Sequence, residues 1–412
     1  MTAVPKRPLT IVAVNKFHAP TGGADTFYLK LNRALRRRGH RVVEFSTHHR
    51  GDVPSDPAAS FVWGLKGDDS AEASVVDLGR AFVHGIWNPE ARREMEHLLE
   101  RVRPDVVHLH NIFYQLSHSI VDPIRKRGIP IVLTLHDYHP VCASNYLYFR
   151  GRICEDCKRG IHHILANRCF HNSIVASSMA FLSMALRTRQ GAYLDQVAHV
   201  VSPSRFLLDK ILEFGIVLPS HSVLPVFYEV PPTMAPSPPG NMVLYLGQFL
   251  EQKGVRDVLM VAARSALPFV FAGRGPLQRE IEQAARRRTG IRCAGFVSGD
   301  AMERLLADAL CLVVPSRWFE NAPAVILDAY ARRRPVVATV IGGIPELVED
   351  GVTGILVPAG DLDALLAAVE QLSREHGRAA AMGEAGWKRL AQRHSLEAYL
   401  DQMDAVYRDV VG

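Results

Sequence analysis

The chain has 412 residues, which is enough for two domains that each bury a full core. Its 48% hydrophobic and 22% charged residues are typical of a soluble globular protein. The net charge of +6 and the pI near 9.0 suit anionic partners such as a nucleotide diphosphate or an anionic membrane face.

No segment approaches the ~20 apolar residues that a membrane span requires. The apolar run at residues 9–14 ends at Asn15-Lys16, so it predicts a first buried strand rather than a signal peptide. We therefore expect a cytoplasmic protein with no nucleic-acid partner. Its charge is compatible with peripheral contact with the inner face of a membrane.

Short apolar strands alternate with helical patterns in the first half of the chain. The predicted strands are residues 10–14, 41–46, 106–110 and 131–136, and the predicted helices are residues 24–38 and 90–102. This alternation predicts a parallel sheet wrapped by helices.

Four cysteines lie in an insert that follows these predicted strands. Cys142, Cys154, Cys157 and Cys169 are separated by eleven, two and eleven residues, which is a spacing typical of thiolate metal ligands. A reducing cytoplasm disfavours disulfides, and we expect a structural, tetrahedral zinc site. An iron–sulfur cluster or metal-free thiols are the alternatives.

An apolar stretch at residues 173–186 comes next and predicts a helix. It either packs against the sheet or, as the less favoured alternative, faces a membrane or a lipid.

A proline-rich stretch at residues 228–241 reads as a linker, and a second alternating set follows it. Its predicted strands are 242–246, 269–272, two near Cys293 and Cys311, and 336–339; its predicted helices are 255–266, 277–287 and 396–411. The fold class is therefore α/β, with two Rossmann-like domains.

The most informative stretch is residues 311–349. A buried strand ends at Pro315, a loop carries Trp318 and Glu320, and a helix start at residues 321–323 precedes Asp328. A further strand runs into a Gly-Gly turn at residues 342–343 and another helix start. Two helix N-termini therefore face one crevice at the carboxyl ends of parallel strands, where α/β sheets bind anionic ligands.

Glu320 and Asp328 are on the order of 10 Å apart along a helix axis. Such a pair can accept hydrogen bonds from both ends of a long polyhydroxylated ligand. The ordinary alternative is a helix-start charge and a solvated helix residue, and the surrounding Trp, Asn, Pro and Gly-Gly pattern favours the binding role.

These residues resemble the signature of retaining glycosyltransferase family 4, whose members have two facing Rossmann-like domains, the GT-B fold. The matching motif is Pro315-Ser316, Glu320, seven residues, Asp328, and then Gly342-Gly343-Ile344-Pro345-Glu346. Asp328 stands where the family has a glutamate. The resemblance implies domains at 1–227, with the insert at 142–169, and at 242–394, and a final helix at 395–412 that returns to the first domain.

The resemblance also implies an activity. A sugar passes from a nucleotide-sugar donor to a hydroxyl of a glycan, a lipid-linked saccharide or a small-molecule acceptor, with no cofactor or metal at the chemistry. Glu320 is expected to hold the transferred sugar and Asp328 the ribose. The insert follows His136 and is expected to shape the acceptor side.

The donor phosphates are expected to meet two further loops. Lys253, at a strand-to-helix turn, can meet phosphate as a point charge, although a lone lysine there is most often a surface residue. Gln248 occupies the family's arginine position, and Arg274 is the candidate to replace that charge. By resemblance, Gly22 and Gly23 form the family's glycine loop; the alternative is an ordinary turn.

The remaining implied contacts come from strand ends. His136 matches the histidine that touches the transferred sugar, whereas a core histidine is the ordinary alternative. Phe296 and Val297 match the segment beside the base, and Gly342, Gly343 and Ile344 the donor-binding turn.

Two other functions stay open at this point. One is a nucleotide-sugar epimerase of the same fold. The other is a non-catalytic nucleotide-sugar-binding protein in which Gln248 reflects lost turnover.

Overall fold

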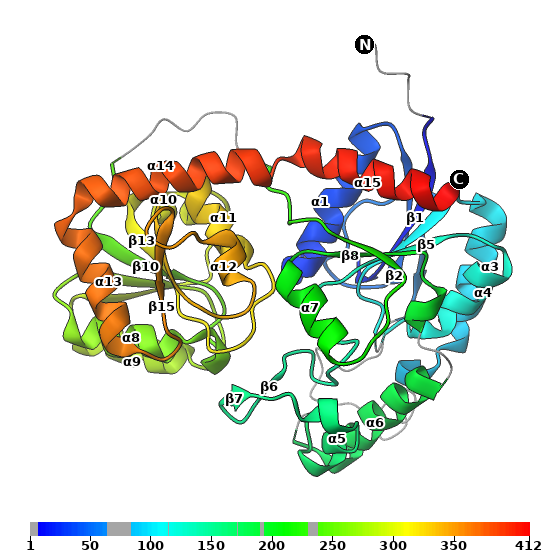
Figure 1. Ribbon diagram of the computed structural model, residues 1–412, viewed down its shortest axis with the longest axis horizontal. Coiled ribbons are helices and arrows are strands. Elements are labelled where there is room, and N and C mark those ends of the chain that lie inside the picture. Colours follow the sequence, from blue (N-terminus) through cyan, green and yellow to red (C-terminus); the bar gives the residue numbers. More distant parts are fainter. Residues whose placement is uncertain (1–6, 64–83, 114, 171, 190–192, 230–237) are drawn as a thin grey trace.

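The computed structural model describes residues 7–63, 84–113, 115–170, 172–189, 193–229 and 238–412, which form two α/β domains side by side (Figure 1). The first holds a seven-stranded parallel sheet of order β3-β2-β1-β4-β5-β8-β9. Its strands are β1 (Thr10–Phe17), β2 (Arg41–Thr47), β3 (Ser60–Val62), β4 (Val106–Leu109), β5 (Ile131–Thr134), β8 (His199–Ser202) and β9 (Ser220–Val223). Its main helices are α1 (Gly23–Arg37), α3 (Pro89–Val102), α4 (Val121–Lys126) and α7 (Arg205–Glu213).

Both faces of this sheet are covered, which is why its strands read as continuous apolar runs. Along β1, Val12 and Val14 belong to one hydrophobic cluster, whereas Ile11 and Ala13 belong to another on the opposite face. The period of two along a strand thus assigns alternate side chains to the two layers of helices.

The second domain repeats this plan with a six-stranded parallel sheet of order β12-β11-β10-β13-β14-β15. Its strands are β10 (Met242–Leu246), β11 (Phe269–Ala272), β12 (Ile291–Gly295), β13 (Ala309–Val314), β14 (Val336–Thr339) and β15 (Gly354–Val357). Its helices are α8 (Val255–Arg264), α9 (Gln278–Arg287), α10 (Gly299–Asp308), α11 (Ala324–Ala331), α12 (Ile344–Leu347) and α13 (Leu362–Arg374).

In each sheet the first strand lies inside, between the strands that follow it. β1 pairs with β2 and β4, and β10 pairs with β11 and β13. The order of strands reverses at these positions, and open α/β sheets bind ligands in the crevice that such a reversal leaves at the carboxyl ends of the strands. The loops after β1 and β10 are therefore placed to form one site.

Two C-terminal helices connect the domains along one side of the molecule. α14 (His376–Arg393) belongs to the second domain, and α15 (Leu396–Val411) crosses onto the first, as expected for the fold (Figure 1). Tyr399, Met403 and Tyr407 of α15 complete the hydrophobic cluster under β1.

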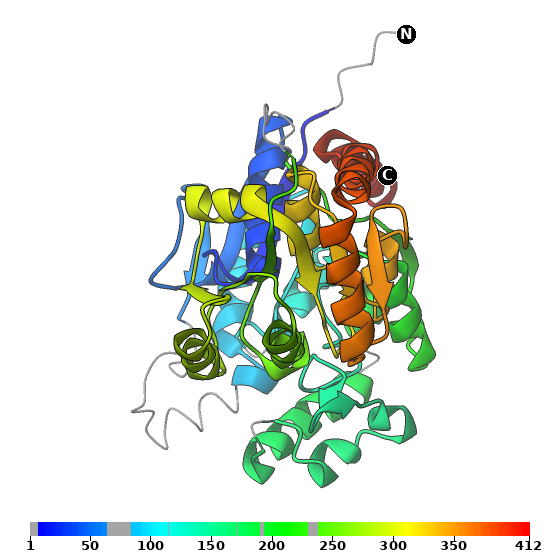
Figure 2. The same cartoon turned by 90° about the vertical axis from the view of Figure 1, so that its left-hand side faces the viewer.

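A separate lobe carries the cysteines and lies at one end of the first domain (Figure 2). It consists of a small antiparallel hairpin, β6 (Tyr148–Phe149) and β7 (Arg152–Ile153), and of the helices α5 (His163–Ala166) and α6 (Ile174–Arg189). α6 buries Ala180 and Met184 and leaves Ile174, Val175 and Leu182 exposed. Among the described helices, none is long and apolar enough to span a membrane.

Several elements differ from the sequence-based expectation. β5 ends at Thr134, so His136 lies in the following loop, and α11 begins at Ala324 with Pro323 as its N-cap residue. The short strands β8, β9 and β15 and the helices α7, α10, α13 and α14 were not predicted. Most of the predicted linker, residues 230–237, lies outside the described residues.

A buried carboxylate anchors α15. Asp404 is 1% exposed, and its two oxygens accept hydrogen bonds from His40 Nε2 at 2.9 Å and from Arg38 Nε at 3.0 Å. We predict that Asp404→Ala lowers the free energy of unfolding by about 3 kcal/mol, because the buried His40 Nε2 donor loses its acceptor and the half-buried Arg38 loses one of its carboxylate partners. Asp401→Ala, which removes an exposed partner of the same arginine, should cost about 0–1 kcal/mol. Equal losses in urea unfolding would contradict this assignment.

Candidate functional site

A cavity of about 550 Å³ lies between the two domains. The first domain contributes the loop after β1 and the start of α1, and the second contributes the loops after β10, β11, β12 and β13 with the start of α11. Of the residues proposed from the sequence, those that line it are Gly22, Gly23, Gln248, Lys253, Arg274, Phe296, Val297, Glu320 and Asp328.

Glu320 is the most constrained of these side chains. It is 6% exposed, and its Oε1 accepts hydrogen bonds from Lys253 Nζ at 2.7 Å, Ser316 Oγ at 2.6 Å and Trp318 Nε1 at 2.8 Å. Burial opposes ionisation, but the Lys253 charge and the three hydrogen bonds outweigh it and keep the pKa of Glu320 below its usual range. The site therefore holds a buried, ionised carboxylate.

Lys253 owes its position to the glycine that follows it. Gly254 has φ 70°, and a Cβ there would overlap the carbonyl oxygen of Pro315. Only glycine therefore allows the loop after β10 to pack against the loop after β13. Lys253 Nζ also lies 4.9 Å from the centre of the Trp318 ring, a cation–π contact.

The Gly-Gly turn at residues 342–343 packs behind Glu320. The turn and the residue after it do not line this cavity or the smaller one described below; these residues are Gly342, Gly343 and Ile344. A Cβ on Gly342, where φ is 61°, would overlap the Glu320 backbone, and Gly343 N–H donates to the Glu320 carbonyl at 2.7 Å. Ile344 is buried in the core, and α12 has only four residues. This turn supports Glu320 from behind.

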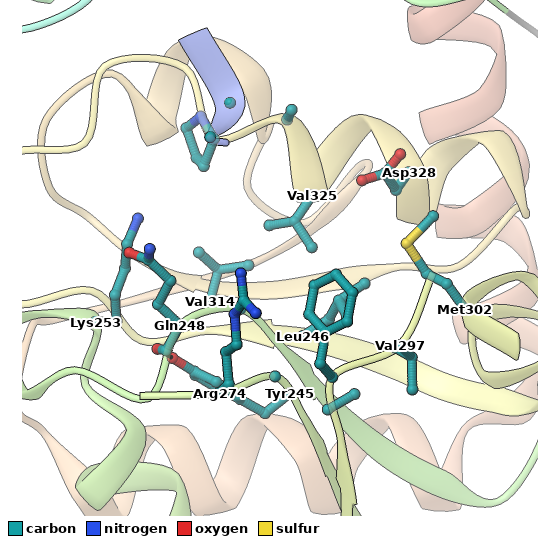
Figure 3. A pocket seen from close by; sticks show the side chains of 18 of the residues that line it. Tyr245, Leu246, Gln248, Lys253, Arg274, Val297, Met302, Val314, Val325 and Asp328 are labelled. Atoms are coloured by element: carbon teal, nitrogen blue, oxygen red, sulfur yellow. Dashed lines mark hydrogen bonds between the residues drawn. The ribbon is translucent and has the colours of Figure 1, made fainter. Parts of the chain in front are cut away.

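The basic and polar side chains gather at one end of the cavity (Figure 3). Lys253, Gln248 and Arg274 lie next to one another there, while Asp328 lies at the other end. The Arg274 guanidinium lies 4.9 Å above the ring of Phe296, which is 65% exposed. The neutral Gln248 thus has a cation beside it.

Asp328 is linked to the chain segment between the domains. Tyr228, in that segment, and the charge of Lys30 of α1 both favour the ionised form of the Asp328 carboxyl. Burial raises the pKa of Asp328, and these two groups offset only part of that effect. Residues of both domains therefore meet at this end of the cavity.

A second cavity of about 220 Å³ meets the first at Lys253 and Glu320, which line both. Its lining residues are His136, Asp137, Tyr138, Asn145, Tyr146, Lys253, Trp318, Phe319, Glu320, Asn321 and Ala322. His136 was proposed from the sequence. The other lining residues of the loop after β5 and of the insert, namely Asp137, Tyr138, Asn145 and Tyr146, were not. A tyrosine in a loop rich in asparagine and serine is the weak signal that could have found Tyr146.

Three histidines form a row that leads to this second cavity. His110 Nδ1 is 2.9 Å from His136 Nε2, and the rings of His108 and His110 lie 4.3 Å apart between their centres. Burial lowers the pKa of His108 to about 3 and, with the Lys16 charge second, that of His136 to about 4. All three rings are therefore neutral near pH 7, because burial also holds the pKa of His110 well below its usual value.

The partners of His110 indicate which nitrogen of His136 carries the proton. His110 Nε2 is buried and has no hydrogen-bond partner among the described residues. A buried N–H without an acceptor is costly, so we assign the His110 proton to Nδ1, which donates to His136 Nε2. Neutral His136 then carries its own proton on Nδ1.

The four cysteines of the lobe are all free thiols that act on one another. Burial, followed by the three neighbouring thiols, raises the pKa of Cys157 to about 12. Burial and then Cys142 and Cys154 raise the pKa of Cys169 to about 11. Within the described part of the chain, however, no three His, Cys, Asp or Glu side chains are close enough together to hold a metal ion, so zinc stays a prediction.

Comparison with known proteins matches both domains. A family model described as Glycosyltransferase Family 4 matches residues 21–223, and one described as Glycosyl transferases group 1 matches residues 240–375. The chain is 33% identical to the α-D-kanosaminyltransferase of Streptomyces kanamyceticus over 177 residues, 41% of this chain and 46% of that protein. The matches span slightly less than half the length of the first curated relatives.

Solved structures share the fold over nearly the whole chain. Sucrose-phosphate synthase from Thermosynechococcus elongatus has a TM-score of 0.73 at 18% identity and covers 97% of this chain and 98% of its own. HepE of Anabaena, solved in complex with UDP-glucose, has a TM-score of 0.67 at 15% identity and covers 97% and 100%. At these identities, the likeness establishes the fold as GT-B.

The tautomer of His136 can be tested without substrate. In His110→Asn the amide nitrogen can take the place of Nδ1 as a donor, so His136 should keep its proton on Nδ1 as in the wild type. In His110→Leu the His136 Nε2 atom loses its donor and is free to carry the proton. Long-range ¹H–¹⁵N spectra of histidine-labelled protein, with His136→Asn to identify the signals, distinguish the two forms. A proton on Nε2 of His136 in the wild type would contradict the assignment.

Proposed function

Because this chain belongs to the family 4 glycosyltransferases, we propose that it is a retaining enzyme that uses a nucleotide-diphosphate sugar as donor. The sugar passes to a hydroxyl of an acceptor. The observation that carries this proposal is the buried, ionised Glu320, which lies beside Lys253 where the two cavities meet. The larger cavity takes the nucleotide, and the transferred sugar lies at the junction.

The donor diphosphate lies between the start of α1 and the basic end of the cavity. α1 has fifteen residues and starts at Gly23 beside the cavity, so its free N–H groups and its dipole favour an anion there. Lys253 and Arg274 supply the opposing positive charges. Arg274 takes over the charge that Gln248 does not carry, and its planar guanidinium can contact two phosphate oxygens at once.

The nucleoside occupies the rest of the larger cavity. Asp328 accepts hydrogen bonds from the ribose hydroxyls, and the base lies beside Phe296 and Val297. The UDP-glucose in the HepE structure supports a uridine nucleotide as the first donor to test. Because Tyr228 also acts on the Asp328 carboxyl, binding of the ribose is linked to the segment between the domains.

The chemistry follows from the charges at the junction. The bond between the anomeric carbon and the diphosphate oxygen breaks, and the acceptor oxygen bonds to the same face of that carbon. The acceptor proton passes to the departing diphosphate. Lys253, Arg274 and the α1 dipole stabilise the charge that develops on the diphosphate, so we propose that the reaction centre needs no metal ion. Glu320 and His136 orient the transferred sugar.

We also propose that Cys142, Cys154, Cys157 and Cys169 hold a structural zinc ion. Their spacing in the sequence supports this proposal, because thiolates are the ligands that structural zinc prefers. In the same lobe, Cys142, Cys169 and Cys154 add to the rise in the pKa of Cys157 that burial causes. The lobe has a core of only four buried residues: Ala143, Ile164, Ala180 and Met184. A core of this size rarely holds a fold without a disulfide or a metal.

Nucleotide binding and transfer test the donor assignment together. UDP, GDP, ADP and TDP are screened by thermal shift, and one should raise the melting temperature because it binds only the folded state. With the matching nucleotide sugar, Glu320→Gln should release nucleoside diphosphate ~100-fold more slowly, as expected when a charged contact to the transition state is lost.

The matched control for this prediction is Glu251→Gln, which changes an exposed carboxylate close to Lys253 and should leave the rate unchanged. The melting temperature of Glu320→Gln without ligand should stay close to that of the wild type. Wild-type turnover by Glu320→Gln would refute the role of this residue, and the absence of any nucleotide-induced shift would refute the donor class.

Elemental analysis tests the zinc proposal. We predict about one zinc per chain and a colourless protein, whereas absorbance near 400 nm would indicate iron–sulfur. Cys157→Ser should lose the metal and lower the melting temperature, because metal binding and folding of the lobe are coupled. Cys293→Ser, which changes a half-buried thiol of the second domain, is the control. Metal-free wild-type protein, with a Cys157→Ser variant that melts like it, would contradict the proposal.

A further inference from the structure

The smaller cavity, of about 220 Å³, extends from the reaction centre to the Cys-rich insert. Three parts of the chain enclose it: the loop after β5, the insert at Asn145 and Tyr146, and the loop of residues 318–322 in the second domain. Of the residues that line it, Lys253 and Glu320 also line the larger cavity. A group bound here would therefore reach the transferred sugar at the junction of the two cavities, beside Lys253 and the departing diphosphate.

Two buried polar atoms of this cavity have no partner among the described residues. They are the hydroxyl of Tyr138, a residue that is 1% exposed, and Oδ1 of Asn321. Asn321 Nδ2 donates to the His136 carbonyl at 2.7 Å, which fixes the amide and leaves Oδ1 free. Burial raises the pKa of Tyr138, so its hydroxyl stays a donor. One buried donor and one buried acceptor are thus available to form hydrogen bonds with a ligand that carries hydroxyls.

Part of the cavity lining is aromatic. The rings of Tyr146 and Trp318 lie 5.0 Å apart between their centres and are tilted by 60°. Trp318 is held by its Nε1–H bond to Glu320, whereas Tyr146 is 46% exposed although it is a large side chain. Small-molecule sites are usually cavities with aromatic walls and a few fixed polar groups, which suit a ligand that has both polar and apolar parts. The C–H faces of a sugar ring match such walls, and its hydroxyls match the polar atoms.

We propose that this cavity is the subsite for a saccharide acceptor, whose ring lies against Tyr146 and Trp318 and whose hydroxyls bond to Tyr138 and Asn321. The proposal rests on the proposed function, because it takes Glu320 as the junction with the donor sugar. The acceptor oxygen forms the new bond to the anomeric carbon, its proton goes to the departing diphosphate, and no further reactant is needed. The insert is thus a wall of the acceptor site, since Tyr146 lies between Cys142 and Cys154.

The test measures saccharide binding to UDP-loaded protein. The probes are methyl glycosides of the common hexoses, 6-deoxyhexoses and N-acetylhexosamines, observed by saturation-transfer NMR and titrated where a signal is found. At least one glycoside should bind, and Tyr146→Ala should weaken its binding at least tenfold while Tyr146→Phe keeps it. Tyr148→Ala, which changes a tyrosine of β6 two residues further along the chain and outside the cavity, should bind like the wild type.

Tyr138→Phe gives a second readout that does not depend on the insert. It removes a buried hydroxyl that has no partner, so the melting temperature without ligand should stay equal or rise, yet glycoside affinity should fall about fivefold or more. The UDP-induced melting shift is recorded for every variant and reports on the donor site alone. If the UDP-induced melting shift is lost while glycoside binding is retained, only the donor assignment is contradicted. Failure of every glycoside to bind, wild-type affinity in Tyr146→Ala, or an equal loss in Tyr148→Ala overturns the acceptor subsite.

Discussion

The arrangement of the site depends on one ion pair, that of Lys253 with Glu320. A carboxylate buried this deeply must be paired, and the pair adds little stability of its own because both charges have lost water. Its value is positional. It joins the loop after β10 to the loop after β13, and it places one positive and one negative charge where the two cavities meet. A diphosphate that arrives beside Lys253 competes with Glu320 for the same cation, which frees the carboxylate for sugar hydroxyls.

Few polar contacts set the width of the cleft. Glu346 of α12 accepts hydrogen bonds from the backbone N–H groups of Arg205 and Phe206 at the start of α7, and Asn321 donates to the His136 carbonyl. None of these contacts involves α15. The domains are therefore joined by a large apolar helix contact on one side and by exchangeable hydrogen bonds beside the site. Such an arrangement favours rotation about α15 over separation of the domains.

The sequence predicted those parts of the site that depend on local spacing. Glu320, Asp328 and Lys253 follow strands whose apolar runs are unambiguous, so their convergence follows from the parallel sheet alone. The role of Gly342 could not be predicted, since it depends on how closely two loops approach in space. Nor could the wall formed by Tyr146, because an insert without periodicity gives no sign of where its hairpin lies. The predicted end of β5 was two residues too late. Leu135 continues the apolar run in the sequence, but the strand itself ends at Thr134.

The helix α15 also determines when the first domain can fold. Tyr399, Met403 and Tyr407 follow the whole second domain in the chain, yet they complete the hydrophobic cluster under β1. Domains generally fold in order from the N-terminus during translation. Here that order cannot be completed, because the second domain and α15 must be synthesised before the first sheet has this covering helix. Until then, the growing polypeptide exposes an apolar sheet face, and this makes the nascent chain a natural client for chaperones.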